Sequence, residues 1–126
     1  MITVLPVKDM SRLEALYREA GLLLEADSGG VEARDGTVSL GYCLYRLDAA
    51  AMEVQALSPA SDLPMADGVL RSALHVAVTR GVLTARYAAG APVECIRRLG
   101  FIKNDENREL DIGKLFSSCQ NCGGAG

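Results

Sequence analysis

The Asp35-Gly36 dipeptide constrains the fold of this chain more than any other short segment. Asp-Gly adopts the positive φ angles of a tight hairpin turn at little cost, and here it separates two strand-like runs, residues 31–34 and 37–46. A third run, residues 52–57, follows a turn at residues 48–51. In it Met52, Val54 and Ala56 alternate with Glu53 and Gln55. The sequence therefore predicts an antiparallel meander in this part of the chain.

Helical patterns lie on both sides of the meander. Apolar residues recur at steps of three and four from residue 13 to residue 23, after Asp9 as the expected N-cap. Gly21 is expected to end the first part of this helix, residues 22–26 to add another turn or two, and residues 28–30 to break the chain. Residues 65–80 form a second predicted helix, with Asp67 in its first turn and Gly81 as its left-handed cap.

The remaining elements complete an ordered series. Short strands are predicted at residues 2–6, 82–88, 101–103 and 109–112, and a third helix at residues 92–99, capped by Gly100. Strands that first meander and then alternate with helices predict an α/β fold with a mixed sheet and helices on both faces. With 126 residues, the chain is expected to form one domain, residues 1–116, followed by a flexible Cys- and Gly-rich tail, residues 117–126.

Composition narrows the classes of function. The formal net charge is −3, which argues against a general nucleic-acid binder, and the adjacent Arg97 and Arg98 are interpreted as a solvated helix face. No run approaches the roughly 20 apolar residues of a membrane span. Lys8 and Asp9 come too early for a signal peptide, so a cytoplasmic location is expected.

The order of elements resembles that of the GNAT acetyltransferases. Five segments carry the resemblance over nearly the whole chain: Ile2-Thr3-Val4-Leu5-Pro6 before Asp9, Asp35-Gly36 before Gly41-Tyr42, Asp67 to Leu74, Arg80-Gly81, and Arg97-Arg98-Leu99-Gly100-Phe101. The resemblance implies a single-domain acetyltransferase-like fold. It also implies transfer of an acetyl group from acetyl-CoA to a small-molecule or peptide amine.

The loop that would hold the cofactor departs from the family pattern, [Gln/Arg]-x-x-Gly-x-[Gly/Ala]. In register this pattern covers residues 61–66, where Ser61 replaces Gln or Arg, Pro64 replaces Gly and Ala66 conforms. Pro64 removes an N–H donor and Asp62 adds a negative charge, so acetyl-CoA is expected to bind weakly or not at all. A shift of the pattern by two residues, to 63–68, would place Ala66 and Gly68 at the small positions but leave Leu63 at the first. The resemblance implies a cofactor-binding set of Leu57, Ser61, Asp62, Leu63, Met65, Ala66 and Asp67.

Candidates for acid and base chemistry are few. The resemblance implies Glu53 as the general base, whereas the family's acidic Tyr falls on Ile96 and its Asn near Ala89. Tyr42, Tyr45 and Tyr87 are the alternatives for a proton donor, although each also suits a half-buried strand position.

The other reactive residues indicate no alternative mechanism. His75 is interpreted as a boundary residue of the second helix, and Cys43 and Cys95 as small core residues. Cys119 and Cys122 form a Cys-x-x-Cys pair in the tail, with too few further ligands for an intramolecular zinc site.

Three functions stay open at this point, and no metal ligand is assigned. The first is an acyl-CoA-dependent N-acetyltransferase of unknown substrate. The second is a GNAT-fold binding or regulatory module that has lost acetyl-CoA binding. The third, a metal- or redox-linked protein that acts through its tail, is weakened by the position of Cys119 and Cys122 at the end of the chain. No nucleic-acid or membrane partner is predicted, and a homodimer is left open.

Overall fold

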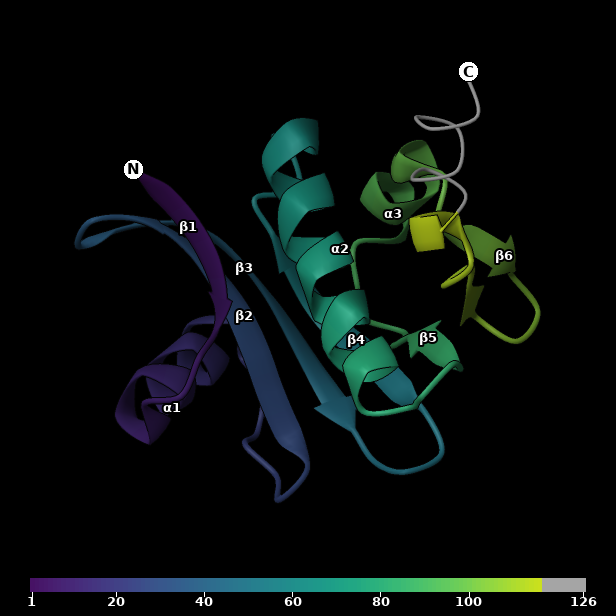
Figure 1. The fold of residues 1–126 in the computed structure, drawn as a ribbon, viewed down its shortest axis with the longest axis horizontal. Coiled ribbons are helices and arrows are strands. Elements are labelled where there is room, and N and C mark those ends of the chain that lie inside the picture. The colour runs from purple at the N-terminus through teal and green to yellow at the C-terminus, as the bar shows by residue number, and fades with distance from the viewer. Residues whose placement is uncertain (117–126) are drawn as a thin grey trace.

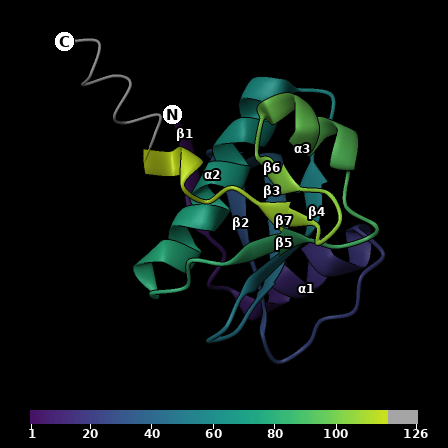
Figure 2. The same cartoon turned by 90° about the vertical axis from the view of Figure 1, so that its right-hand side faces the viewer.

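The computed structural model describes residues 1–116 as a seven-stranded mixed sheet with helices on both faces (Figure 1). The strand order is β1-β2-β3-β4-β5-β7-β6, and β4 and β5 form a parallel pair at the centre. Helix α1 lies on one face of the sheet, and α2 lies on the other. Figure 2 shows α3 beside α2, on the side of the sheet opposite α1. The predicted fold class is confirmed.

Strands β1 to β4 form the predicted meander. They span Ile2–Pro6, Ser28–Asp35, Val38–Leu47 and Met52–Ser58, and each pairs antiparallel with the next. The tight turn lies one residue later than predicted, at residues 36–37, because Asp35 is the last residue of β2 and pairs with Val38. Gly36 has a φ of 63°, which a glycine adopts at little cost. The predicted break at residues 28–30 is wrong because β2 begins at Ser28. A Cβ on Gly29 would lie 2.7 Å from the Tyr45 ring, so the glycine permits close cross-strand packing.

A β-bulge in β4 reverses part of the predicted side-chain pattern. Tyr45 pairs with Val54, whereas the preceding Leu44 pairs with Ala56, so Gln55 is an extra residue on β4. Ala56 was predicted on the same face as Val54, and this is wrong. Leu57 instead packs with Val54 in the core beneath α2, and Ala56 packs on the α1 side.

Helix α1 spans Met10–Glu19, with Asp9 as its N-cap through a hydrogen bond from the Ser11 amide to Asp9 Oδ1 (2.9 Å). The predicted helical turns at residues 22–26 are absent from the described chain, since the helix ends at Glu19 and Leu23 is 81% exposed. The buried Tyr17 hydroxyl lies 2.8 Å from the Gly29 carbonyl oxygen and 2.7 Å from that of Tyr45, which attaches α1 to β2 and β3.

Helix α2 spans Leu63–Thr79 and begins two residues before the predicted start at residue 65. Asp62 is the N-cap, and Pro64 lies in the first turn of the helix, where its missing N–H costs no helical bond. Asp67 consequently falls in the second turn, not the first as predicted. Six buried residues of α2 cover the sheet: Ala66, Val69, Leu70, Ala73, Leu74 and Ala77.

The C-terminal part contains three short strands and one helix. Strand β5 spans Ala85–Tyr87, α3 spans Val93–Leu99, β6 spans Ile102–Asn104 and β7 spans Glu109–Leu110. The strand predicted at residues 82–88 is therefore too long. Gly100 caps α3 with a φ of 79°, as predicted.

Candidate functional site: a groove where strands β4 and β5 separate

The central parallel pair opens into a groove. Pairing of β4 with β5 ends at Val54 and Tyr87, and the Ala88 amide donates to the Val54 carbonyl oxygen at 2.8 Å. Beyond that point β4 continues to Ser58 while the chain after β5 turns toward α3. The space between them is a groove of about 450 Å³, which we call the splay groove. It is lined by Ala20, Leu22, Tyr42, Gln55, Ala56, Leu57, Ser58, Ala60, Ala88, Gly90 and Pro92.

The bulge places polar groups in an otherwise apolar groove. Gln55, the extra residue of β4, lines it together with Tyr42 of β3 and Ser58 at the end of β4. Burial raises the pKa of Tyr42, and the nearby Glu19 carboxylate raises it further. Tyr42 therefore keeps its phenolic proton at neutral pH and can donate it.

The three tyrosines predicted as alternative proton donors have different surroundings. Tyr45 is buried on the α2 side of the sheet, where burial raises its pKa to about 12. The Tyr87 hydroxyl lies 3.2 Å from Asp105 Oδ1, away from the residues that line the splay groove. Tyr42 is the one of the three that lines this groove.

The N-terminus of α2 already holds a carboxylate of its own. The Met65 amide donates to Asp62 Oδ1 at 3.2 Å, and the Ala66 amide donates to the Asp62 carbonyl oxygen at 2.8 Å. Pro64 has no N–H. Three of the four amide positions from 63 to 66 are thus unavailable to an anionic ligand. The sequence predicted the missing N–H donor and the added negative charge. The structure adds that the Asp62 carboxylate accepts a hydrogen bond from an amide that would otherwise be open to an anion.

The predicted cofactor-binding residues lie in two places. Leu57 lines the splay groove, whereas the others surround the start of α2. There Ser61 and Asp62 are exposed, Leu63 and Met65 are half-buried, and Ala66 is fully buried. Asp67 is ion-paired with Arg71 at 2.8 Å, so its carboxylate is engaged within the helix.

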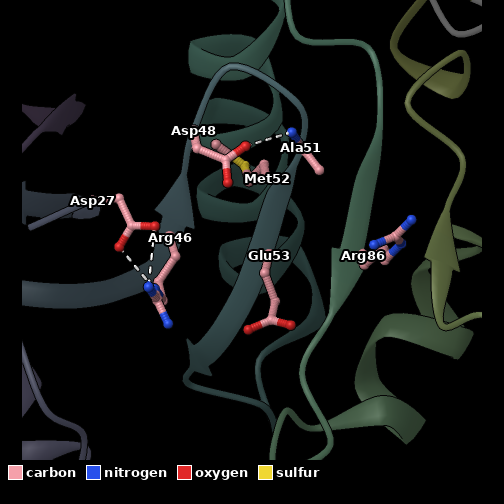
Figure 3. Close-up of a pocket in the computed structure, with 7 residues that line it drawn as sticks. All are labelled: Asp27, Arg46, Asp48, Ala51, Met52, Glu53 and Arg86. Atoms are coloured by element: carbon pink, nitrogen blue, oxygen red, sulfur yellow. Dashed lines mark hydrogen bonds and ion pairs between the residues drawn. The ribbon is translucent and has the colours of Figure 1, made fainter. Parts of the chain in front are cut away.

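Glu53 lies in a separate surface pocket of about 260 Å³. Figure 3 shows its side chain between Arg46 of β3 and Arg86 of β5, while Arg46 binds Asp27 at 2.8 Å. Glu53 is exposed, and its Oε1 lies 3.4 Å from the Gln55 amide nitrogen. Gln55 is therefore the structural link between the predicted base and the splay groove.

Several lining residues carried no signal in the sequence. Gln55 and Ser58 line the groove because of the bulge in β4 and because β4 separates from β5. No local sequence pattern predicts either feature. Ile96, at the family's Tyr position, is fully buried in the core, and Ala89 is an exposed loop residue. Cys43 and Cys95 are free and buried, as predicted.

Other classes of site find no support in residues 1–116. No group of three or more His, Cys, Asp or Glu side chains in this part could hold a metal ion. Cys119 and Cys122 lie outside the described residues. Among residues 1–116, no helix has the length and apolar character needed to cross a membrane.

The mixed sheet, its central parallel pair and the two helical layers define the acetyltransferase-like (GNAT) fold. Among solved structures, the chain is similar to the PaiA N-acetyltransferase from Thermoplasma acidophilum in complex with coenzyme A, with a TM-score of 0.50 and 14% identity. The match covers 77% of this chain and 64% of that chain, so the chain spans less than two thirds of its neighbour's length. The likeness shows a shared fold. No family model matches the sequence, and a search of curated proteins found no match.

Proposed function

We propose that this chain is an acyl-CoA-dependent N-acyltransferase that holds the thioester arm of acetyl-CoA in the splay groove. The observation that carries the proposal is the end of β4–β5 pairing at Val54 and Tyr87, which opens a groove of about 450 Å³ within the sheet. A narrow, largely apolar groove between strands suits an extended thioester arm. The structural neighbour was solved with coenzyme A, which agrees with this class of donor.

The chemistry requires a base and an acid. The amine nitrogen attacks the thioester carbonyl carbon, the C–S bond breaks, and the thiolate leaves. A base must take the proton from the amine, and an acid must protonate the thiolate. We assign the base to Glu53 and the acid to Tyr42. Glu53 contacts the Gln55 side chain at 3.4 Å but lines a separate pocket, so its proton transfer would pass through a bound water.

A specific observation favours the second candidate, a GNAT-fold module without catalysis. Asp62 and Pro64 remove most of the α2 amide donors, and Ile96 stands where the family has a proton donor. The loss of amide donors opposes binding of a diphosphate, and the absence of a proton donor at Ile96 opposes catalysis. Neither feature closes the splay groove. This candidate predicts no thiol release from acetyl-CoA with any amine.

Calorimetry with two donors tests the proposal. S-acetylpantetheine, which lacks every phosphate, should bind with a Kd within about tenfold of that of acetyl-CoA, since most of the contact area lies in the groove. Ala56→Phe places a bulky side chain in the lining of the groove and should abolish binding of both donors. Ala89→Phe, in the exposed loop, is the matched control.

Thiol release is then followed against a panel of small and peptide amines. Binding of both donors without thiol release would favour the non-catalytic module. Absence of binding by either donor to a folded protein would contradict the proposed function.

A further inference from the structure

A second hollow extends the splay groove toward α3. It has a volume of about 510 Å³ and is lined by Ala60, Ala91, Pro92, Val93, Glu94, Cys95 and Arg98. Ala60 and Pro92 line both spaces, so the two adjoin each other at these residues. A ligand that leaves the splay groove past Ala60 and Pro92 would reach the hollow that Arg98 lines.

The two adjacent arginines of α3 differ in their partners. Arg97 is held by two hydrogen bonds to Asp105, each 3.0 Å long, and lies 3.6 Å from Glu94. Arg98 has no ion-pair partner within residues 1–116, and it lines the hollow. The prediction of a solvated helix face describes Arg97 incompletely, because Arg97 is ion-paired across to Asp105.

Arg98 is an exposed residue at the edge of the hollow. Burial raises the pKa of the Cys95 thiol, and the nearby Arg98 opposes that shift. Arg98 is thus close enough to the lining to influence an ionisable group there. At the same time, the α2 N-terminus, on the other side of the Ala60 loop, is occupied by the Asp62 carboxylate. Among the groups described around these two spaces, Arg98 is thus the positive charge open to an anion.

We propose that Arg98 binds the phosphate next to the pantetheine arm, and that the unit recognised is a 4′-phosphopantetheine thioester, with the adenosine half contributing little. This inference rests on the proposed function, because it places the thioester end in the splay groove. A guanidinium offers paired N–H donors to phosphate oxygens, and a phosphate near Arg98 does not require any α2 amide. Glu94 lies one turn before Arg98 and tempers the positive charge.

Three donors and three variants test the inference by calorimetry. S-acetyl-4′-phosphopantetheine should bind within about threefold of acetyl-CoA, and S-acetylpantetheine roughly tenfold more weakly, as expected for loss of one charge-assisted contact. Arg98→Gln should remove that tenfold difference and leave S-acetylpantetheine binding unchanged. Glu94→Gln should tighten both phosphorylated donors. Lys103→Gln, on β6, removes one exposed positive charge outside the hollow and should change nothing.

The outcomes separate this inference from the proposed function. If S-acetylpantetheine binds but the phosphorylated donors still bind more tightly to the Arg98→Gln variant, the phosphate-binding role of Arg98 is overturned. The proposed binding of the thioester arm in the splay groove is then unaffected. If acetyl-CoA binds much more tightly than S-acetyl-4′-phosphopantetheine, recognition of the adenosine half overturns the inference. If no donor binds to the folded protein, both proposals fail. Circular dichroism of each variant checks that it is folded. If Arg98→Lys keeps the tighter binding of the phosphorylated donors, the contact depends on positive charge.

Discussion

Replacing Asp62 by serine separates its two roles, capping α2 and repelling an anion. Serine also accepts a hydrogen bond from an N-terminal amide, so the cap to the Met65 N–H is retained while the charge is lost. A phosphate about 5 Å from the Asp62 carboxylate would be repelled by roughly 1 kcal/mol in water-like surroundings and roughly 3 kcal/mol at an effective dielectric of 20. Because Asp62 is exposed, the lower value applies.

For a phosphate bound at the α2 N-terminus, Asp62→Ser should therefore tighten acetyl-CoA binding about fivefold, whereas a phosphate bound only at Arg98 predicts no change in affinity. The melting temperature should stay unchanged in either case. Asp62→Ala should lose the cap and destabilise the fold by about 1 kcal/mol. Combined Asp62→Gly and Pro64→Gly should tighten binding further by restoring two donors, at about 1.5–3 kcal/mol for each bond to a charged group.

Titration calorimetry measures the Kd and differential scanning calorimetry the stability. Glu106→Gln removes a carboxylate from the exposed turn between β6 and β7 and controls for net charge. Low-micromolar binding by the unmodified protein, with no response to Asp62→Ser, would refute the reasoning.

Four further changes have defined outcomes. Glu53→Gln should lower any acyl transfer at least roughly a hundredfold with donor affinity unchanged, and an active enzyme indifferent to it would remove Glu53 from the mechanism. Gly41→Ala should destabilise the fold by about 1–3 kcal/mol, because its Cβ would lie 2.6 Å from the last carbonyl oxygen of β4. Gly68→Ala is the control in the same melting experiment, because a Cβ there would meet no atom within 4 Å. Tyr17→Phe should cost about 1–3 kcal/mol, since the Gly29 and Tyr45 carbonyl groups lose the one hydroxyl proton that they share, and an unchanged denaturation midpoint would contradict that role. Removal of residues 117–126 should shift the melting temperature by only a few degrees, whereas stoichiometric zinc lost on Cys119→Ser would show that the tail matters.

The sequence determined those features that depend on neighbouring residues alone. The Asp9 cap, the Gly100 cap and, to within one residue, the hairpin turn at Gly36 were predictable, because each rests on φ angles or hydrogen bonds within a few residues. The order of these elements was enough to indicate the fold. The weakened anion site was also visible in the sequence, since a proline lacks an N–H in any context.

Tertiary structure decided the positions that depend on distant partners. Residues 28–30 resemble a chain break in isolation, but they form a strand because they pair with residues 44–46 of β3, where Gly29 leaves room for the Tyr45 ring. The face of Ala56 depends on an extra residue opposite β3, and a two-residue repeat contains no information about such a bulge.

The splay groove has the same origin. It exists because β4 continues after β5 has ended, and its lining comes from elements far apart in the sequence. Arg98 appeared as an ordinary surface charge until the fold brought Asp105 to Arg97 and left Arg98 beside the hollow. Local sequence specifies turns, caps and periodicity through short-range geometry, whereas a binding site requires knowing which distant side chains share one space.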